Sequence, residues 1–233
     1  MAPMRRFLAV LATAGATAAL LAGCSSAKQA SGPLPDATTL VQQASVTTKD
    51  LASAHLALTV DGKIKGLPVK TLEGDLTNRP NTAAKGEAKI TMMGQDLDVK
   101  FVVIDGDLYA AMSGDDYDDF GPAEKIYDVA AILDPDKGLA NLLATLTDAK
   151  AEGREKVAGQ QTVKVTGKAP ADAVNKLAGQ LKATEPLPCT VWIREDGDHE
   201  LVQAQLEQSP GNTIAMTLSQ WNAPVTVEKP AGA

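Results

Sequence analysis

The chain has 233 residues, with 22 Lys and Arg against 29 Asp and Glu, a net charge of −7 at neutral pH and two cysteines. This acidity argues against nucleic acid as a partner, because proteins that bind it present clustered basic side chains. Two cysteines also exclude a disulfide-rich scaffold, and the length suffices for one domain with a sizeable apolar core.

The N-terminus is typical of a secreted lipoprotein. Arg5 and Arg6 precede an uncharged apolar run at residues 7–21, and the chain then reads Leu21-Ala22-Gly23-Cys24, a lipobox. The run is short for a membrane-spanning helix, which needs ~20 apolar residues. We expect cleavage before Cys24, with residues 1–23 as the signal peptide. An ordinary signal peptide with a chance cysteine, or an uncleaved anchor helix, is the alternative.

Acylation of Cys24 would keep the mature chain on the membrane, since two or three acyl chains hold a protein firmly. Residues 24–35 are small and polar without periodicity, and they predict a flexible tether. Residues 36–233 then form a single domain. Cys189 is left without a disulfide partner, and its strand-like surroundings predict a buried thiol.

The domain is predicted to begin with a helix over residues 36–53. In it Leu40, Ala44 and Leu51 recur at helical spacing behind a possible Asp36 cap. The apolar spacing then changes to two, as in strands with one buried face. This alternation covers residues 55–61, 70–76, 87–92 and 97–103.

Turn signals connect further strands and helices. Asp105-Gly106 predicts a tight hairpin into a strand at residues 108–112, and a solvated acidic loop is expected at residues 115–119. Pro135 and Pro170 each predict the start of a helix. Further strands are predicted near residues 161–165 and, as a C-terminal meander, at residues 190–195, 200–207 and 213–220.

Roughly ten antiparallel strands with three or four helices indicate an α+β fold, in which helices lie on the apolar face of a curved sheet. A doubly wound fold is disfavoured, because its parallel strands would be continuously apolar rather than alternating. No long internal repeat stands out.

Motifs for catalysis are absent from the sequence. His55 and His199 lack a metal-ligand spacing, and the chain has no G-x-S-x-G sequence and no glycine loop suited to phosphate. The segment from Asp134 begins like a calcium loop, but Thr145 stands where the bidentate glutamate belongs. We therefore expect no metal, no cofactor and no enzymatic activity.

The predicted apolar face consists mainly of Ala, Val, Leu, Ile and Met, and the whole chain has only three Phe. A broad face of small side chains under alanine-rich helices could enclose unfilled volume suited to acyl chains. It could equally close at normal packing density. The residues by themselves favour neither of these two possibilities.

Several stretches spread along the chain carry a family likeness. They include Gly32-Pro33-Leu34-Pro35-Asp36-Ala37, Asp119-Phe120-Gly121-Pro122-Ala123, Asp148-Ala149-Lys150-Ala151-Glu152-Gly153-Arg154 and Thr190-Val191-Trp192-Ile193. Through them the chain resembles the mycobacterial LppX/LprAFG lipoproteins, and within that family the LprG-like members.

The resemblance implies a half-barrel antiparallel sheet with helices on its concave apolar face, enclosing a large lipid cavity. It implies binding of multi-acylated lipids and glycolipids: triacylated phosphatidylinositol mannosides, lipomannan, lipoarabinomannan and triacylglycerol. It also implies a major-facilitator membrane exporter as partner. The expected location is the outer face of the plasma membrane, facing the periplasm or cell wall.

Combined with the strand and helix patterns, the resemblance gives a set of expected cavity-lining residues. These are Leu58, Leu72, Leu76, Ala88, Ile90, Met92, Val99, Phe101, Val103, Ala110, Leu139, Leu142, Leu143, Leu146, Val174 and Leu177. A monomeric lipid carrier is the leading hypothesis. A structural or adaptor lipoprotein that supports the exporter or cell-wall assembly is the alternative, and two lobes of a solute-binding protein are not apparent.

Overall fold

A computed structural model describes residues 32–231 of the chain. The predicted signal peptide, the lipobox and Cys24 lie outside these residues. From Leu34 onward the chain forms one compact body. Within residues 32–231, none of the helices has the length and apolar character needed to cross a bilayer.

Eleven antiparallel strands form one open sheet in the described part of the chain, in the order β6-β5-β4-β3-β2-β1-β11-β10-β9-β8-β7. Strands consecutive in sequence pair with one another, except that β6 and β7 form the two edges of the sheet and do not pair. β1 also pairs with β11 and so joins the two halves of the sheet. The strands are β1 Ser53–Asp61, β2 Val69–Thr77, β3 Ala83–Met92, β4 Gln95–Ile104, β5 Asp107–Ala111, β6 Asp118–Pro122, β7 Thr147–Val157, β8 Gln160–Ala169, β9 Leu187–Arg194, β10 Leu201–Ser209 and β11 Asn212–Ser219.

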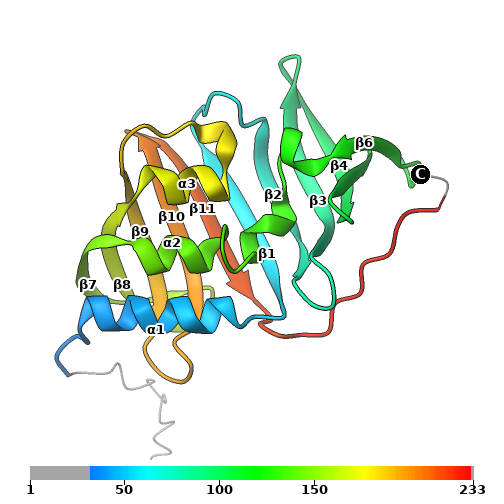
Figure 1. Cartoon of the computed structure of the whole chain (residues 1–233). Coiled ribbons are helices and arrows are strands. Elements are labelled where there is room, and N and C mark those ends of the chain that lie inside the picture. The colour runs from blue at the N-terminus through cyan, green and yellow to red at the C-terminus, as the bar shows by residue number, and fades with distance from the viewer. Residues whose placement is uncertain (1–31, 232–233) are drawn as a thin grey trace, which may run out of the picture. The chain divides into compact units, whose positions relative to one another are not determined.

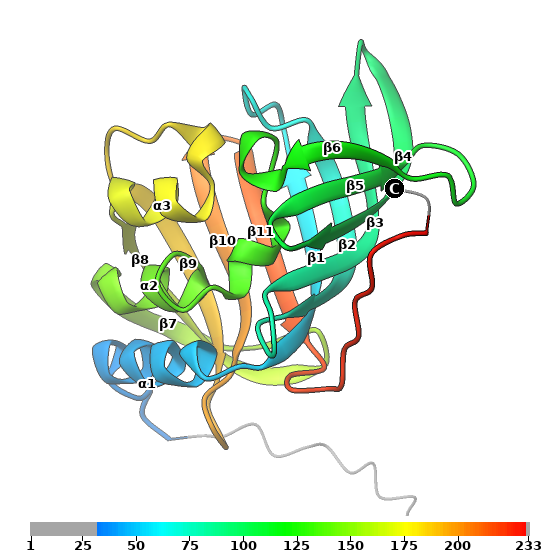
Figure 2. The same cartoon turned by 45° about the vertical axis from the view of Figure 1, so that its right-hand side comes forward.

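Among residues 32–231, three α-helices lie over one face of the half-sheet β7–β11, while β2–β6 curve away from them (Figures 1 and 2). The helices are α1 Ala37–Lys49, α2 Leu139–Thr145 and α3 Ala171–Leu177. Short 3-10 turns are η1 Ala123–Lys125, η2 Val129–Leu133 and η3 Gly179–Leu181. Of these, η2 packs against β2 and β3, so it covers part of the apolar face that the α-helices leave open.

The strand register places apolar side chains opposite one another, so that they form rows across the sheet. On the helix side, Leu58 lies opposite Leu72, which lies opposite Ala88, which lies opposite Val99. Residues one position along each strand point to the other face, because side chains alternate along a strand. The apolar rows and the helices together bury a single core.

The predicted α+β fold with helices on the apolar face of a curved sheet is confirmed, as is the Asp36 cap, whose carboxylate accepts a hydrogen bond from the Thr39 amide at 2.8 Å. The tight hairpin is confirmed too, with Asp105 and Gly106 at φ 55° and 85°. Cys189 is buried, and its burial raises the thiol pKa to about 12.

Three local predictions are wrong, and one strand was not predicted. The helix expected over residues 36–53 ends at Lys49, and Ser53 already begins β1. The helix expected from Pro135 begins at Leu139, because the Asp134 carboxylate accepts hydrogen bonds from the amides of Asp136 and Lys137 and holds this segment in a turn. The last two residues of the acidic loop expected at residues 115–119 belong to strand β6. Strand β7 was not expected, because its largely polar sequence suits a sheet edge and lacks clear alternation.

Candidate functional site

Most of the expected cavity-lining residues lie in the continuous apolar core. Leu139, Leu142 and Leu143 of α2 have no exposed surface. The members of the expected set found in the core are Leu58, Leu72, Leu76, Phe101, Val103, Leu139, Leu142, Leu143, Val174 and Leu177. Side chains therefore fill the space between the short helices and the sheet in this conformation.

The remaining members of the expected set lie at the margin of the core or beyond it. Ala88, Ile90 and Leu146 are partly buried against the core. Val99 and Ala110 are buried, whereas Met92 is 39% exposed. Of the members that reach the surface, Ala88, Ile90 and Met92 lie on β3, where the α-helices do not cover the sheet (Figure 2), and Leu146 lies at the end of α2.

A pair of glycines brings β2 and β3 unusually close together. Gly74 lies directly opposite Gly86, in a helix-side row that continues to Phe101. A Cβ atom added to Gly86 would lie 2.6 Å from the Gly74 Cα and closer still to the Glu73 carbonyl oxygen. Glycine is therefore required here by backbone approach, a use of glycine typical of strongly bent strands.

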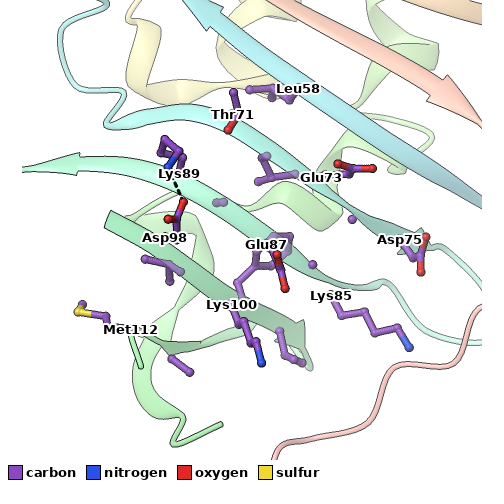
Figure 3. A pocket seen from close by; sticks show the side chains of 18 of the residues that line it. Leu58, Thr71, Glu73, Asp75, Lys85, Glu87, Lys89, Asp98, Lys100 and Met112 are labelled. Atoms are coloured by element: carbon purple, nitrogen blue, oxygen red, sulfur yellow. Dashed lines mark ion pairs between the residues drawn. The ribbon is translucent and has the colours of Figure 1, made fainter. Parts of the chain in front are cut away.

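The opposite face of β1–β4 carries an open groove of about 940 Å³ that no sequence pattern predicted. Charged side chains project into it from neighbouring strands (Figure 3). Lys89 pairs with Asp98 at 2.6 Å, and Lys100 pairs with Asp115 at 2.7 Å. These contacts depend on strand register, which the sequence alone does not give.

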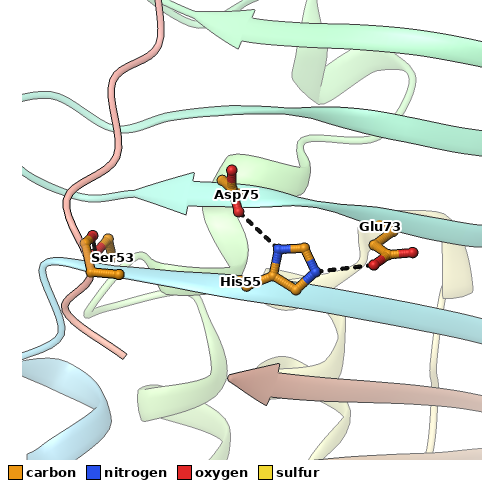
Figure 4. Close-up of polar contacts among 5 residues, drawn as sticks. Ser53, His55, Glu73 and Asp75 are labelled. Atoms are coloured by element: carbon orange, nitrogen blue, oxygen red, sulfur yellow. Dashed lines mark hydrogen bonds and ion pairs between the residues drawn. The ribbon is translucent and has the colours of Figure 1, made fainter. Parts of the chain in front are cut away.

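His55 lies at one end of this groove between two carboxylates (Figure 4). Its Nδ1 is 2.8 Å from an Asp75 oxygen and its Nε2 is 3.3 Å from a Glu73 oxygen. Partial burial lowers the His55 pKa, but the hydrogen bonds and charges of Asp75 and Glu73 outweigh it, so the pKa is raised. Among residues 32–231, no group of three His, Cys, Asp or Glu side chains is arranged to hold a metal.

Comparison with known proteins links these features to one family. The model of the LppX_LprAFG lipoprotein family matches residues 36–227. The chain is 57% identical over 228 residues to the lipoarabinomannan carrier protein LprG of Mycobacterium leprae, an alignment that covers 97% of this chain and 96% of the relative. It is 46% identical over 224 residues to the protein of that name from Mycobacteroides abscessus, covering 96% and 97%.

Two solved structures share the fold. The crystal structure of LprF from Mycobacterium bovis matches with a TM-score of 0.77 and 34% identity, covering 86% of this chain and 99% of that one. The crystal structure of lipoprotein LppX from Mycobacterium tuberculosis matches with a TM-score of 0.65 and 30% identity, covering 82% and 97%. The predicted resemblance, including the likeness to LprG, is confirmed.

Proposed function

The chain belongs to the LppX_LprAFG lipoprotein family, and from this membership we propose that it carries multi-acylated lipids and glycolipids between membrane layers. Lipoarabinomannan, lipomannan, triacylated phosphatidylinositol mannosides and triacylglycerol are the proposed cargo. The names of the LprG relatives support the first of these. The acyl chains would contact the helix-side face of the sheet while the sugars stay in water.

One observation supports this proposal above the others: the apolar helix-side face continues past the helices onto β3 and β4. Ala88 and Ile90 there are only partly buried, so the core leaves apolar surface in reach of a ligand. Exposing an acyl chain to water costs ~25 cal/mol per Å² of apolar surface, which makes spontaneous transfer between membranes slow. An apolar face that accepts the chains removes much of this barrier.

The cavity proposed for the cargo would open by separation of the short helices from the sheet. Each of α2 and α3 has only seven residues, and short helices depend on tertiary packing for their stability. The fully buried Leu142 and Leu143 would then exchange contacts within the apolar core for contacts with acyl chains. Such an exchange of apolar contacts has little net cost, because both partners are hydrocarbon.

The N-terminal features complete the proposal. We propose that residues 1–23 are removed, that Cys24 is acylated and that residues 24–35 tether the domain of residues 36–233 to the outer face of the plasma membrane. A major-facilitator exporter is the proposed membrane partner, and the carrier is proposed to act as a monomer. A Cys24→Ser chain should still bind lipid but support transport poorly, and full transport by that form would contradict a role for the anchor.

The test is native mass spectrometry of the mature Cys24→Ser chain purified from a mycobacterial host. We expect lipid to copurify with it, and loading to fall in Ala88→Trp and Val99→Trp, which place a large side chain on the apolar face. Glu87→Trp is the control, because it adds the same side chain to the opposite face of β3. An empty chain that cannot be loaded would refute the carrier proposal.

The variants Ala88→Trp and Val99→Trp also distinguish the carrier function from the adaptor alternative. If Ala88→Trp and Val99→Trp prevent loading but restore every phenotype of a strain that lacks the gene, lipid carriage is not the essential activity. A structural or adaptor role would then be favoured. If they fail to restore the phenotypes while Glu87→Trp succeeds, carriage is required.

A further inference from the structure

The β3–β4 hairpin extends beyond both of its neighbours in the sheet. The pairing of β2 with β3 ends at Val69 and Ile90, apart from one further hydrogen bond from the Thr91 amide to the Pro68 carbonyl, and the pairing of β5 with β4 ends at Ala111 and Lys100. The end of the hairpin therefore stands out from the body, at the top of Figures 1 and 2. We refer to residues 90–97 as the arm.

The two faces of the arm differ in polarity. On the groove side, Lys70 pairs with Asp96 at 2.7 Å, and Thr91 donates a hydrogen bond to the same carboxylate at 2.8 Å. At the base of the arm on this side, Lys89 pairs with Asp98 at 2.6 Å. Each charged side chain that flanks the tip is therefore paired with an opposite charge.

The helix-side face of the arm is mostly apolar, with Gln95 opposite Met92 as its polar member, and its exposure rises toward the tip. Val99 is 7% exposed, Ile90 and Leu97 are half-buried, Met92 is 39% exposed and Met93 is 98% exposed. These side chains extend the apolar face of the sheet into solvent. A carrier would need such a surface where cargo enters.

The turn at the tip places a methionine where the backbone disfavours it. Met93 and Gly94 have φ angles of 52° and 80°, as in a two-residue type I′ turn, which favours Asn, Asp or Gly at its first position. Asp105-Gly106 and Ala158-Gly159 form turns with the same signs of φ. Those two turns carry a short side chain at the first position, whereas the arm carries a long apolar one in left-handed conformation and in water.

We propose that the arm docks on a lipid bilayer, with Met92 and Met93 inserted at the boundary between headgroups and acyl chains. The uncharged tip and the paired charges behind it favour this occupant, because insertion would not strip water from an isolated charge. Methionine is flexible and apolar, so it suits a fluid partner of no fixed shape. The purpose of docking rests on the proposed carrier function, but the docking itself can be measured without cargo.

The experiment places a polarity-sensitive fluorophore on the tip of the mature Cys24→Ser chain through Met93→Cys. Labelling is specific, because Cys189 is buried with its thiol pKa raised to about 12. With phosphatidylcholine vesicles we expect the emission to move to shorter wavelength. The control is Ala158→Cys, which puts the same label on the matched turn of β7–β8 and should show no such shift.

A second variant excludes a merely structural role for the methionine. Met93→Asn suits the left-handed turn and should raise the urea midpoint, yet we expect on the order of a tenfold loss of vesicle-bound protein, since one inserted apolar side chain is removed. Ala158→Asn makes the same exchange in the other turn and should leave vesicle binding unchanged.

Docking is refuted if the label at position 93 stays in a water-like environment with vesicles, or if Met93→Asn binds them as well as the parent chain. A shift that depends on protein concentration without vesicles would also refute it, in favour of contact with a second copy. Docking without copurified lipid would contradict only the carrier proposal, and copurified lipid without docking would contradict only the role of the arm.

Discussion

Replacing Gly86 by Ala should destabilise the fold far more than its size suggests. The added Cβ would lie 2.6 Å from the Gly74 Cα, whereas carbon atoms pack at roughly 3.5–4.0 Å. Strands β2 and β3 must then separate by about 1 Å at this point. Overpacking of this kind costs about 1–3 kcal/mol, and each weakened ladder hydrogen bond adds about 1 kcal/mol.

Some of this cost is offset, because an alanine in a strand is better than a glycine by roughly 0.5–1 kcal/mol. The net loss expected for Gly86→Ala is therefore about 2–3 kcal/mol, a large fraction of the roughly 5–15 kcal/mol that stabilises a domain. Urea unfolding followed by circular dichroism measures it. Gly153→Ala is the matched control, since a Cβ added to Gly153 in strand β7 would have no atom within 4 Å.

We expect Gly153→Ala to leave stability unchanged or to raise it slightly. If the free energy of unfolding of Gly86→Ala lies within about 0.5 kcal/mol of that of the parent chain, close approach of the two strands is refuted as a limit on stability. If both variants lose stability equally, the loss reflects glycine replacement in a strand rather than backbone contact at Gly86.

Three further predictions concern the core and the groove. Leu142→Ala removes a fully buried side chain of α2 and should cost about 2–5 kcal/mol in urea unfolding, and a smaller loss would indicate an interior that collapses easily. Cys189→Ser should destabilise more than Cys189→Ala, because only serine leaves a hydroxyl in apolar surroundings; equal losses would contradict this. The raised pKa of His55 stabilises the fold below the unfolded pKa of about 6.5, and this stabilisation is lost as pH rises through the folded value. His55→Gln should therefore lower the melting temperature more at about pH 5.5 than at about pH 8, and an equal loss at both would exclude protonated His55 as the cause.

The sequence predicts features that depend on nearby residues, and it misses features that depend on contacts between distant segments. The alternation that places Leu58 and Leu72 on one face is local, so it predicted β1, β2 and their buried face correctly. The start of α2 could not be read from Pro135, because the turn there is held by the carboxylate of Asp134, and turn and helix compete for the same amides. Strand β7 lacked a local signal, since a polar edge strand is fixed by its partner.

The candidate site shows the same limit. Alternation put Met92 on the apolar side correctly, but it gave no sign that β3 and β4 extend beyond β2 and β5. The charged groove was missed because Glu73, Lys85 and Lys100 come from three strands and meet only through register. Properties along one strand were predictable, whereas properties that depend on where neighbouring strands begin and end were not.

The pairing of β1 with β11 has a consequence for how the protein is made. It links residues His55 and Ser219, which are separated by most of the domain, and it is the junction between the two halves of the sheet. Contacts so distant in sequence form slowly, because a long loop must close first. A chain emerging from a ribosome or a translocation channel cannot complete its sheet until β11 has appeared. The sheet therefore stays incomplete during synthesis. Until β11 is released, the incompletely folded chain can still pass through a narrow channel.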